Sequence, residues 1–103
     1  MKTIISSIEP SLSSIMDKRF GRAKWFCIYD TETKEHSFIE NPFHDSQGGA
    51  GVKTAELAVE KGAKKVISGH YGPKAKEILE KFNIQMVEIE EEYSINKIIE
   101  MIK

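Results

Sequence analysis

Apolar residues fall in short clusters separated by polar or glycine-rich turns, and the spacing within each cluster predicts its structure. Runs rich in β-branched and aromatic residues are typical of strands. In contrast, Ala75, Ile78, Leu79 and Phe82 recur at the spacing of one helical face. Isoleucines between Ser94, a good helix N-cap, and the C-terminus repeat this helical spacing. The predicted strands are residues 2–6, 23–30, 35–40, 65–68 and 84–89, and the predicted helices are residues 52–61, 73–82 and 95–103.

The order of these elements, β-β-β-α-β-α-β-α, restricts how they can be joined. The first three strands most simply form an antiparallel meander, and the last two follow crossover helices, which are right-handed in nearly all sheets. The expected fold class is α/β, with a five-stranded mixed sheet in the order 3-2-1-4-5 and only strand 2 antiparallel. The first two helices should cover one face and the third helix the other. We expect a core that contains Ile4, Phe26, Ile28, Ala55, Val59, Val66, Ile78, Leu79, Phe82, Val87, Ile95, Ile98 and Ile99.

The composition is that of one small globular domain, residues 1–103, with 40% hydrophobic and 30% charged residues. The net charge is −1, so no global positive field is present to bind nucleic acid or an anionic membrane. The single cysteine, Cys27, excludes an intramolecular disulfide and a four-thiolate metal site made by one chain. No apolar run approaches the roughly 20 residues that span a bilayer, and the N-terminus lacks the pattern of a signal peptide. We therefore expect a cytoplasmic protein.

The predicted topology places candidate chemistry at one edge of the sheet. Strands 1, 3, 4 and 5 all end there, so residues 7–22, 41–51, 69–73 and 90–93 form the loops of that edge. Open α/β sheets bind ligands outside the carboxyl ends of their strands, where the connections diverge. We expect the site between strands 1 and 4.

The first unusual sequence at this edge is residues 17–22, Asp-Lys-Arg-Phe-Gly-Arg. Arg19 and Arg22 beside Gly21 can form an anion clamp, because each guanidinium presents a planar fork of donors. Asp17 could hold one arginine in place. The alternative is that the charged residues only pin a surface loop and that Phe20 plugs the core.

Two glycine-rich segments precede predicted helices. Residues 48–51, Gly-Gly-Ala-Gly, would let a ligand approach the free N–H groups of a helix start, although a flexible connection fits equally well. Residues 69–73 place His70 between glycines, where it is either a metal ligand or proton carrier or an ordinary surface residue. His44 is the other candidate metal ligand, whereas Cys27 is expected to be a small buried hydrophobe.

The sequence gives no positive case for hydrolytic catalysis. The first strand carries no carboxylate that could bind a catalytic metal pair. No nucleophile elbow, Cys–His pair or His-Glu-x-x-His motif is present.

The motifs together resemble the dinitrogenase iron–molybdenum cofactor biosynthesis family, of the NifX type and the NifB C-terminal domain, as a small stand-alone member. They are Asp17-x-Arg19-Phe20-Gly21-Arg22-Ala23, an aromatic strand ending in Tyr29-Asp30, Glu40-Asn41, Gly48-Gly49-Ala50-Gly51 and Gly69-x-x-Gly72-Pro73-x-Ala75. The resemblance implies a ribonuclease-H-like fold and a non-catalytic carrier of an anionic iron–sulfur or molybdenum-containing metal–sulfide cluster. The implied ligand-binding residues are Arg19, Gly21, Arg22, Asn41, Gly48, Gly49, Gly51, Gly69 and Gly72, with His44 and His70 as candidate metal ligands.

Partners implied by this reading are proteins that donate or accept the metallocluster, and the chain itself would be a monomer or a weak homodimer. Two other functions fit the same residues. The helix starts and arginines also suit a nucleotide- or phosphate-binding protein. A protein-interaction module without a small ligand is the third reading.

Overall fold

Strand β1 lies at the centre of a mixed sheet, with the β2–β3 hairpin on one side and β4 and β5 on the other. The computed structural model describes residues 1–103. The strands are β1 (Lys2–Ser7), β2 (Trp25–Asp30), β3 (His36–Glu40), β4 (Ala63–Ser68) and β5 (Gln85–Glu88), and the helices are α1 (Ala50–Glu60), α2 (Pro73–Lys81) and α3 (Ile95–Ile102).

The strand order is β3-β2-β1-β4-β5, which confirms the order predicted from the sequence. Strand β2 pairs antiparallel with both β1 and β3, whereas β1–β4 and β4–β5 are parallel pairs. The antiparallel strand is therefore β2 alone, as predicted. Helix α1 connects β3 to β4 across the sheet, and α2 connects β4 to its parallel neighbour β5.

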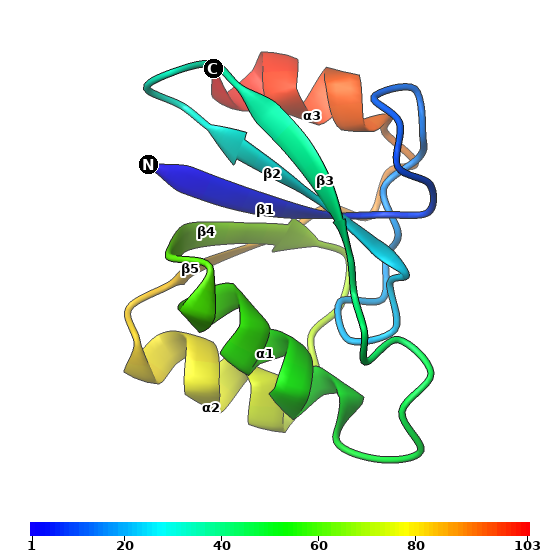
Figure 1. Cartoon of the computed structure of the whole chain (residues 1–103), viewed down its shortest axis with the longest axis vertical. Helices are drawn as coiled ribbons and strands as arrows, with labels where there is room; N and C mark the ends of the chain where they lie inside the picture. Colours follow the sequence, from blue (N-terminus) through cyan, green and yellow to red (C-terminus); the bar gives the residue numbers. More distant parts are fainter.

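Two apolar clusters cover the two faces of the sheet, because successive strand residues point to opposite sides. Ile4 and Val66 belong to the cluster beneath α1 and α2, and their neighbours Ile5 and Ile67 belong to the cluster beneath α3. Figure 1 shows α1 and α2 together on one side of the sheet and α3 on the other. The predicted division of the helices between the faces is confirmed.

Helix α3 begins at a capped end and covers its face with isoleucines. The hydroxyl of Ser94 accepts a hydrogen bond from the backbone N–H of Lys97 at 3.1 Å, which satisfies one of the free donors of a helix start. Ile95, Ile98 and Ile99 are buried against the sheet. None of the three helices combines the length and the apolar character needed to cross a membrane.

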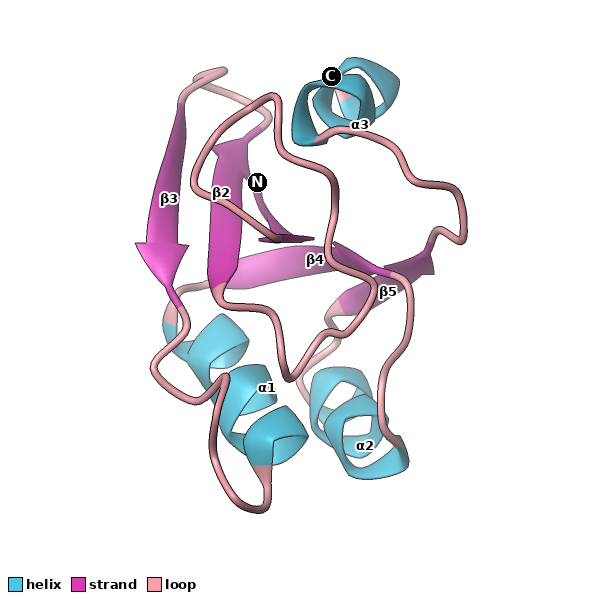
Figure 2. Ribbon diagram, turned by 90° about the vertical axis from the view of Figure 1, so that its right-hand side faces the viewer, coloured by secondary structure: helices cyan, strands magenta, loops and turns pink.

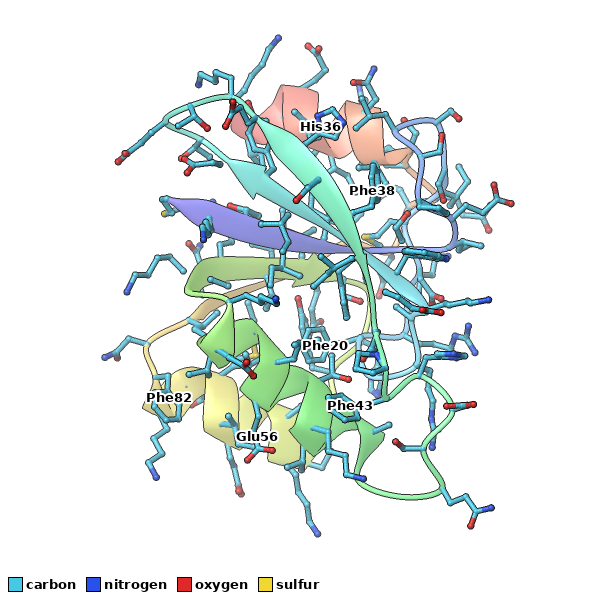
Figure 3. All side chains as sticks on the ribbon, viewed as in Figure 1. Phe20, His36, Phe38, Phe43, Glu56 and Phe82 are labelled. Carbon is cyan, nitrogen blue, oxygen red and sulfur yellow. The ribbon has the colours of Figure 1, made fainter.

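The prediction that Phe82 belongs to the core is wrong, because its side chain is 51% exposed. Helix α2 ends at Lys81, and Phe82 is the C-cap residue with φ −98° and ψ 14°. Asn83 follows with φ +58°, so the chain turns away before a further helical turn can bring the ring onto the sheet. Figure 3 shows Phe82 at the outer end of α2. Ile84 is buried in the adjoining core in its place.

Because Ile98 is fully buried on the α3 face, Ile98→Ala should lower the free energy of unfolding by about 2–5 kcal/mol, the range for deleting a large aliphatic side chain from a core. Met101 lies in the same helix but is 54% exposed, so Met101→Ala is the matched control and should change stability by less than about 0.5 kcal/mol. Urea unfolding followed by circular dichroism measures both. Equal losses would show that α3 does not pack as described.

Candidate functional site

The loops that follow β1, β3, β4 and β5 emerge at the same edge of the sheet, on the right-hand side of Figure 1. Figure 2 presents this edge toward the viewer, with the starts of α1 and α2 beneath the loops. The connections of β1 and β4 diverge here, one toward the β2–β3 hairpin and the other toward α2. This is the position that the topology predicts for a ligand.

The space between the ends of β1 and β4 is filled by two buried serines. The hydroxyls of Ser6 and Ser68, near the ends of the two strands, lie 2.7 Å apart, and both lie within hydrogen-bond reach of the Asp17 carbonyl oxygen. The Asp17 N–H donates to the Ser6 carbonyl at 3.0 Å. The loop after β1 thus crosses the strand ends, and the space open to a ligand lies farther out, beside α1 and α2.

Asp17 also positions Arg19. Its carboxylate, only 7% exposed, accepts hydrogen bonds from the Arg19 backbone N–H at 2.9 Å, from Nε at 3.2 Å and from Nη2 at 3.1 Å. These hydrogen bonds, and after them the attraction of the opposite charges, raise the pKa of Arg19. The expectation that Asp17 holds one of the arginines is confirmed. The Arg19 side chain remains largely exposed, so it can also meet a ligand.

The residue next to Arg19 anchors the loop in the core. Phe20 is buried between the rings of Phe26 and Tyr71, at centroid distances of 5.8 and 5.1 Å. Figure 3 shows the Phe20 ring between the sheet and α1. Phe20 and Asp17 therefore hold the loop in place, as the alternative interpretation of this segment states. Arg19 and Arg22 can still contact a ligand, because their side chains remain exposed.

Arg22 links this loop to the segment that precedes α1. Its Nη1 donates to the carbonyl oxygens of His44, at 3.4 Å, and Ser46. No carboxylate pairs with Arg22. Its charge is therefore not neutralised by a neighbouring side chain.

A pocket of about 480 Å³ lies between the 19–22 segment and the starts of α1 and α2. Arg19, Arg22 and Lys74 supply three cationic side chains, and no carboxylate lines the pocket. Asp17 balances the charge of Arg19 from behind the lining, whereas Arg22 and Lys74 have no ion-pair partner. The full lining is Arg19, Phe20, Gly21, Arg22, Gly49, Ala50, Gly51, Val52, His70, Gly72, Pro73, Lys74 and Ala75.

Both helices at the pocket begin without a side-chain cap. Gly49 is the N-cap of α1, with φ +69°, and Gly72 is the N-cap of α2. Neither helix has an acidic residue in its first turn, although a negative charge there is stabilising by roughly 0.3–1 kcal/mol. The helix starts thus present uncapped backbone donors and partial positive charge toward the pocket, an arrangement that suits an anion.

Lys74 is a site residue that the sequence analysis missed. It follows Pro73 in the first turn of α2, where the helix dipole disfavours a cation. Lys74 is exposed and forms no ion pair. The available signal was a lysine in the first turn of a predicted helix, where the helix dipole disfavours a cation.

The glycines of this edge have two different roles. A Cβ on Gly21 would lie 2.8 Å from Cα and N of Gly51, and a Cβ on Gly69 would lie 2.7 Å from the Cβ of Lys18, so these two glycines permit close packing of the chain. A Cβ on Gly48, Gly49 or Gly72 would meet nothing within 4 Å. At the helix starts the missing side chains therefore leave open space beside backbone donors.

The structure brings most of the predicted ligand-binding residues together but not all of them. Asn41 is fully buried, and its Nδ2 donates to the carbonyl oxygens of Ala23 at 2.9 Å and Gly21 at 3.3 Å, so it supports the pocket wall from behind. Gly48, Gly69 and the candidate metal ligand His44 also lie outside the lining. The predicted residues that share the pocket are Arg19, Gly21, Arg22, Gly49, Gly51, Gly72 and His70.

The groups that could bind a metal ion directly are few. No three His, Cys, Asp or Glu side chains gather at any point of the chain. Cys27 is fully buried beneath α3 beside Ile5 and Tyr29, and this burial raises the pKa of its thiol to about 12. The site is thus built from hydrogen-bond donors and positive charges, with one imidazole among them.

Known proteins resemble this chain over nearly all of its length. The family model described as dinitrogenase iron–molybdenum cofactor matches residues 1–103. The apo form of the orange protein from Desulfovibrio gigas is 25% identical, with 98% of this chain and 85% of that chain covered and a TM-score of 0.92. A putative NifB protein from Thermotoga is 31% identical over 98% of this chain and 85% of that chain, with a TM-score of 0.84. No curated protein matches the chain.

The close contact between Gly21 and Gly51 predicts that alanine lowers the stability of the protein at Gly21 but not at Gly48. Gly21→Ala should destabilise the protein by roughly 1–3 kcal/mol, because the new methyl group would overlap backbone atoms. Gly48→Ala is the control, since its φ is not positive and its Cβ would meet open space, and it should change stability by less than about 0.5 kcal/mol. Thermal or urea unfolding tests the pair. A neutral Gly21→Ala would contradict the close approach of the two segments.

The burial of Cys27 predicts a thiol that is inert in the folded protein. With a pKa of about 12, almost none of it is thiolate at neutral pH, and only the thiolate is nucleophilic. Labelling by a maleimide or a disulfide reagent should be slow in buffer and fast in denaturant. Fast labelling of the folded protein would show that the α3 face opens readily.

Proposed function

The chain belongs to the dinitrogenase iron–molybdenum cofactor family, and on that premise we propose that it is a carrier that binds an anionic metal–sulfur cluster in the pocket beside α1 and α2. Its cargo would be an iron–sulfur or molybdenum-containing cluster or a precursor of one. A carrier of this kind exchanges its cargo with donor and acceptor proteins.

The single observation that carries the proposal is that the pocket is lined by positively charged side chains and by backbone N–H groups without a partner. Arg19, Arg22 and Lys74 line it without a carboxylate, and two uncapped helix starts open onto it. Metal–sulfide clusters are anions whose sulfides accept hydrogen bonds, so donors and cations can hold them without protein thiolates. The open space at Gly49 and Gly72 would let the cluster approach the backbone.

The pocket lacks most of the side chains that enzymes use for catalysis, and this supports a binding role. No Ser, Thr, Cys, Asp or Glu lines it, so it contains no hydroxyl or thiol nucleophile and no carboxylate base. His70 is its one side chain suited to proton transfer near neutral pH. A general acid or base without a partner group is a poor basis for a hydrolytic or transfer reaction.

Titration with tetrathiomolybdate under anaerobic conditions, followed by absorption, tests the proposal. Arg22→Ala and Lys74→Ala should each weaken binding, Arg22→Ala by about tenfold or more, because a hydrogen bond to a charged group contributes roughly 1.5–3 kcal/mol. Lys74→Ala is the cleaner variant, since Lys74 forms no ion pair whose loss could disturb the fold. Lys64→Ala is the matched control, because Lys64 is exposed on β4 outside the pocket.

Equal affinities in all variants would remove the pocket from the binding site. Thermal shift with inorganic phosphate and with ATP separates the main competing function. A ligand at 100 times its dissociation constant should stabilise the folded protein by about 2.7 kcal/mol. A shift with phosphate or nucleotide, in a protein that takes up neither tetrathiomolybdate nor an iron–sulfur cluster, would replace the carrier proposal by phosphate binding.

A further inference from the structure

His70 is the one side chain of the pocket that could coordinate a transition metal. The other lining residues are apolar side chains, glycines, Arg19, Arg22 and Lys74, and cationic side chains are not metal ligands. Zinc and similar ions require about four ligands in a protein site, and no group of even three candidate ligands is present. A free metal ion would therefore find no site here, whereas a cluster that brings its own sulfides needs few ligands from the protein.

The backbone around His70 is held in place by the loop that carries the arginines. The N–H of Phe20 donates to the His70 carbonyl oxygen at 3.1 Å, and Arg19 and His70 form an isolated parallel bridge. His70 therefore sits beside Arg19 in a fixed arrangement.

The imidazole ring of His70 has no partner within the protein. The His70 side chain is exposed, and no hydrogen bond or ion pair within the protein involves its imidazole. In other proteins a histidine that ligates a metal commonly uses one ring nitrogen and donates from the other. Both nitrogens of His70 are free for such a pair of contacts, one to a metal and the other to solvent.

We propose that His70 is the single inner-sphere ligand of the pocket, and that the protein takes up preassembled clusters with one exchangeable metal position rather than free metal ions. The inference rests on the proposed function. A lone pair of an imidazole nitrogen would replace one terminal ligand on the metal, and that ligand would leave with its own electron pair. No metal changes oxidation state in this exchange. The arginines and backbone donors would hold the remaining sulfides by hydrogen bonds.

Two anaerobic probes separate the role of His70 from that of the arginines. Tetrathiomolybdate carries only terminal sulfides on a saturated metal, so it measures the hydrogen-bonding part of the site alone. A thiolate-terminated cubane iron–sulfur cluster has exchangeable terminal ligands. The protein, with isotopically labelled histidine, is loaded with the reduced cubane and analysed by pulsed electron paramagnetic resonance. His70→Ala is compared with His44→Ala, a matched control whose histidine lies outside the pocket lining.

The expected result has two parts. Wild type and His44→Ala should show coupling from one histidine nitrogen and bind the cubane equally well. His70→Ala should lose the coupling and weaken cubane binding by about tenfold or more, the lower end of what disturbing a metal's ligand environment costs. Tetrathiomolybdate affinity should be the same in all three proteins. Equilibrium dialysis with ferrous or zinc ions alone should show no stoichiometric binding that depends on His70.

The outcomes distinguish this inference from the proposed function. If wild type binds neither probe, the carrier function itself fails. If both probes bind but His70→Ala keeps the nitrogen coupling or the full cubane affinity, the carrier function stands and His70 is not the ligand. Loss of tetrathiomolybdate binding in His70→Ala would also overturn the inference, because His70 would then act as a hydrogen-bond donor to sulfide.

Discussion

The position of the Asp17 backbone is the constraint on which the whole functional edge depends. Its carbonyl lies at the Ser6 and Ser68 hydroxyls, where β1 and β4 end, and its carboxylate holds Arg19. Asp17 thus fixes the point at which the loop after β1 crosses the sheet, and it also fixes the orientation of the Arg19 guanidinium. Because the serines and Asp17 are buried, these polar groups would be costly to leave unpaired. The arginine is consequently held before any ligand arrives, which lowers the entropy lost on binding.

The same edge departs from several rules of local stability. Two helices begin with glycine where a serine or aspartate would satisfy a free donor, and Lys74 lies where the helix dipole disfavours it. Helix α3, on the other face, follows the rule with Ser94 as its cap. In contrast to α3, the starts of α1 and α2 have no side chain that accepts from their free N–H groups. An anion bound between them would satisfy the donors and offset the lysine's unfavourable position together.

Much of the fold could be predicted because connection rules act on element order alone. Short turns, right-handed crossovers and the helical stripe of α3 leave few arrangements of these elements. Phe82 was placed wrongly because the apolar repeat continues to Phe82, whereas the helix ends at Lys81 and leaves the Phe82 side chain exposed at the C-cap. The Asp17–Arg19 contact was accessible from the sequence, since the residues lie two apart. The burial of Asn41 was not, because its partners Ala23 and Gly21 come from a distant loop that only the folded chain brings near.

A site made of many weak donors and at most one coordinate bond is well matched to temporary binding. A set of thiolates would hold a cluster through several coordinate bonds, each of which must exchange before release. Hydrogen bonds from Arg22 and the helix starts can instead be replaced one at a time by water or by an incoming protein. The single cysteine, Cys27, is buried beneath α3 on the opposite face of the sheet, so no thiol lines the pocket to compete for the metal. Affinity and release would then be set mainly by electrostatics, so rising ionic strength should favour transfer of the cargo.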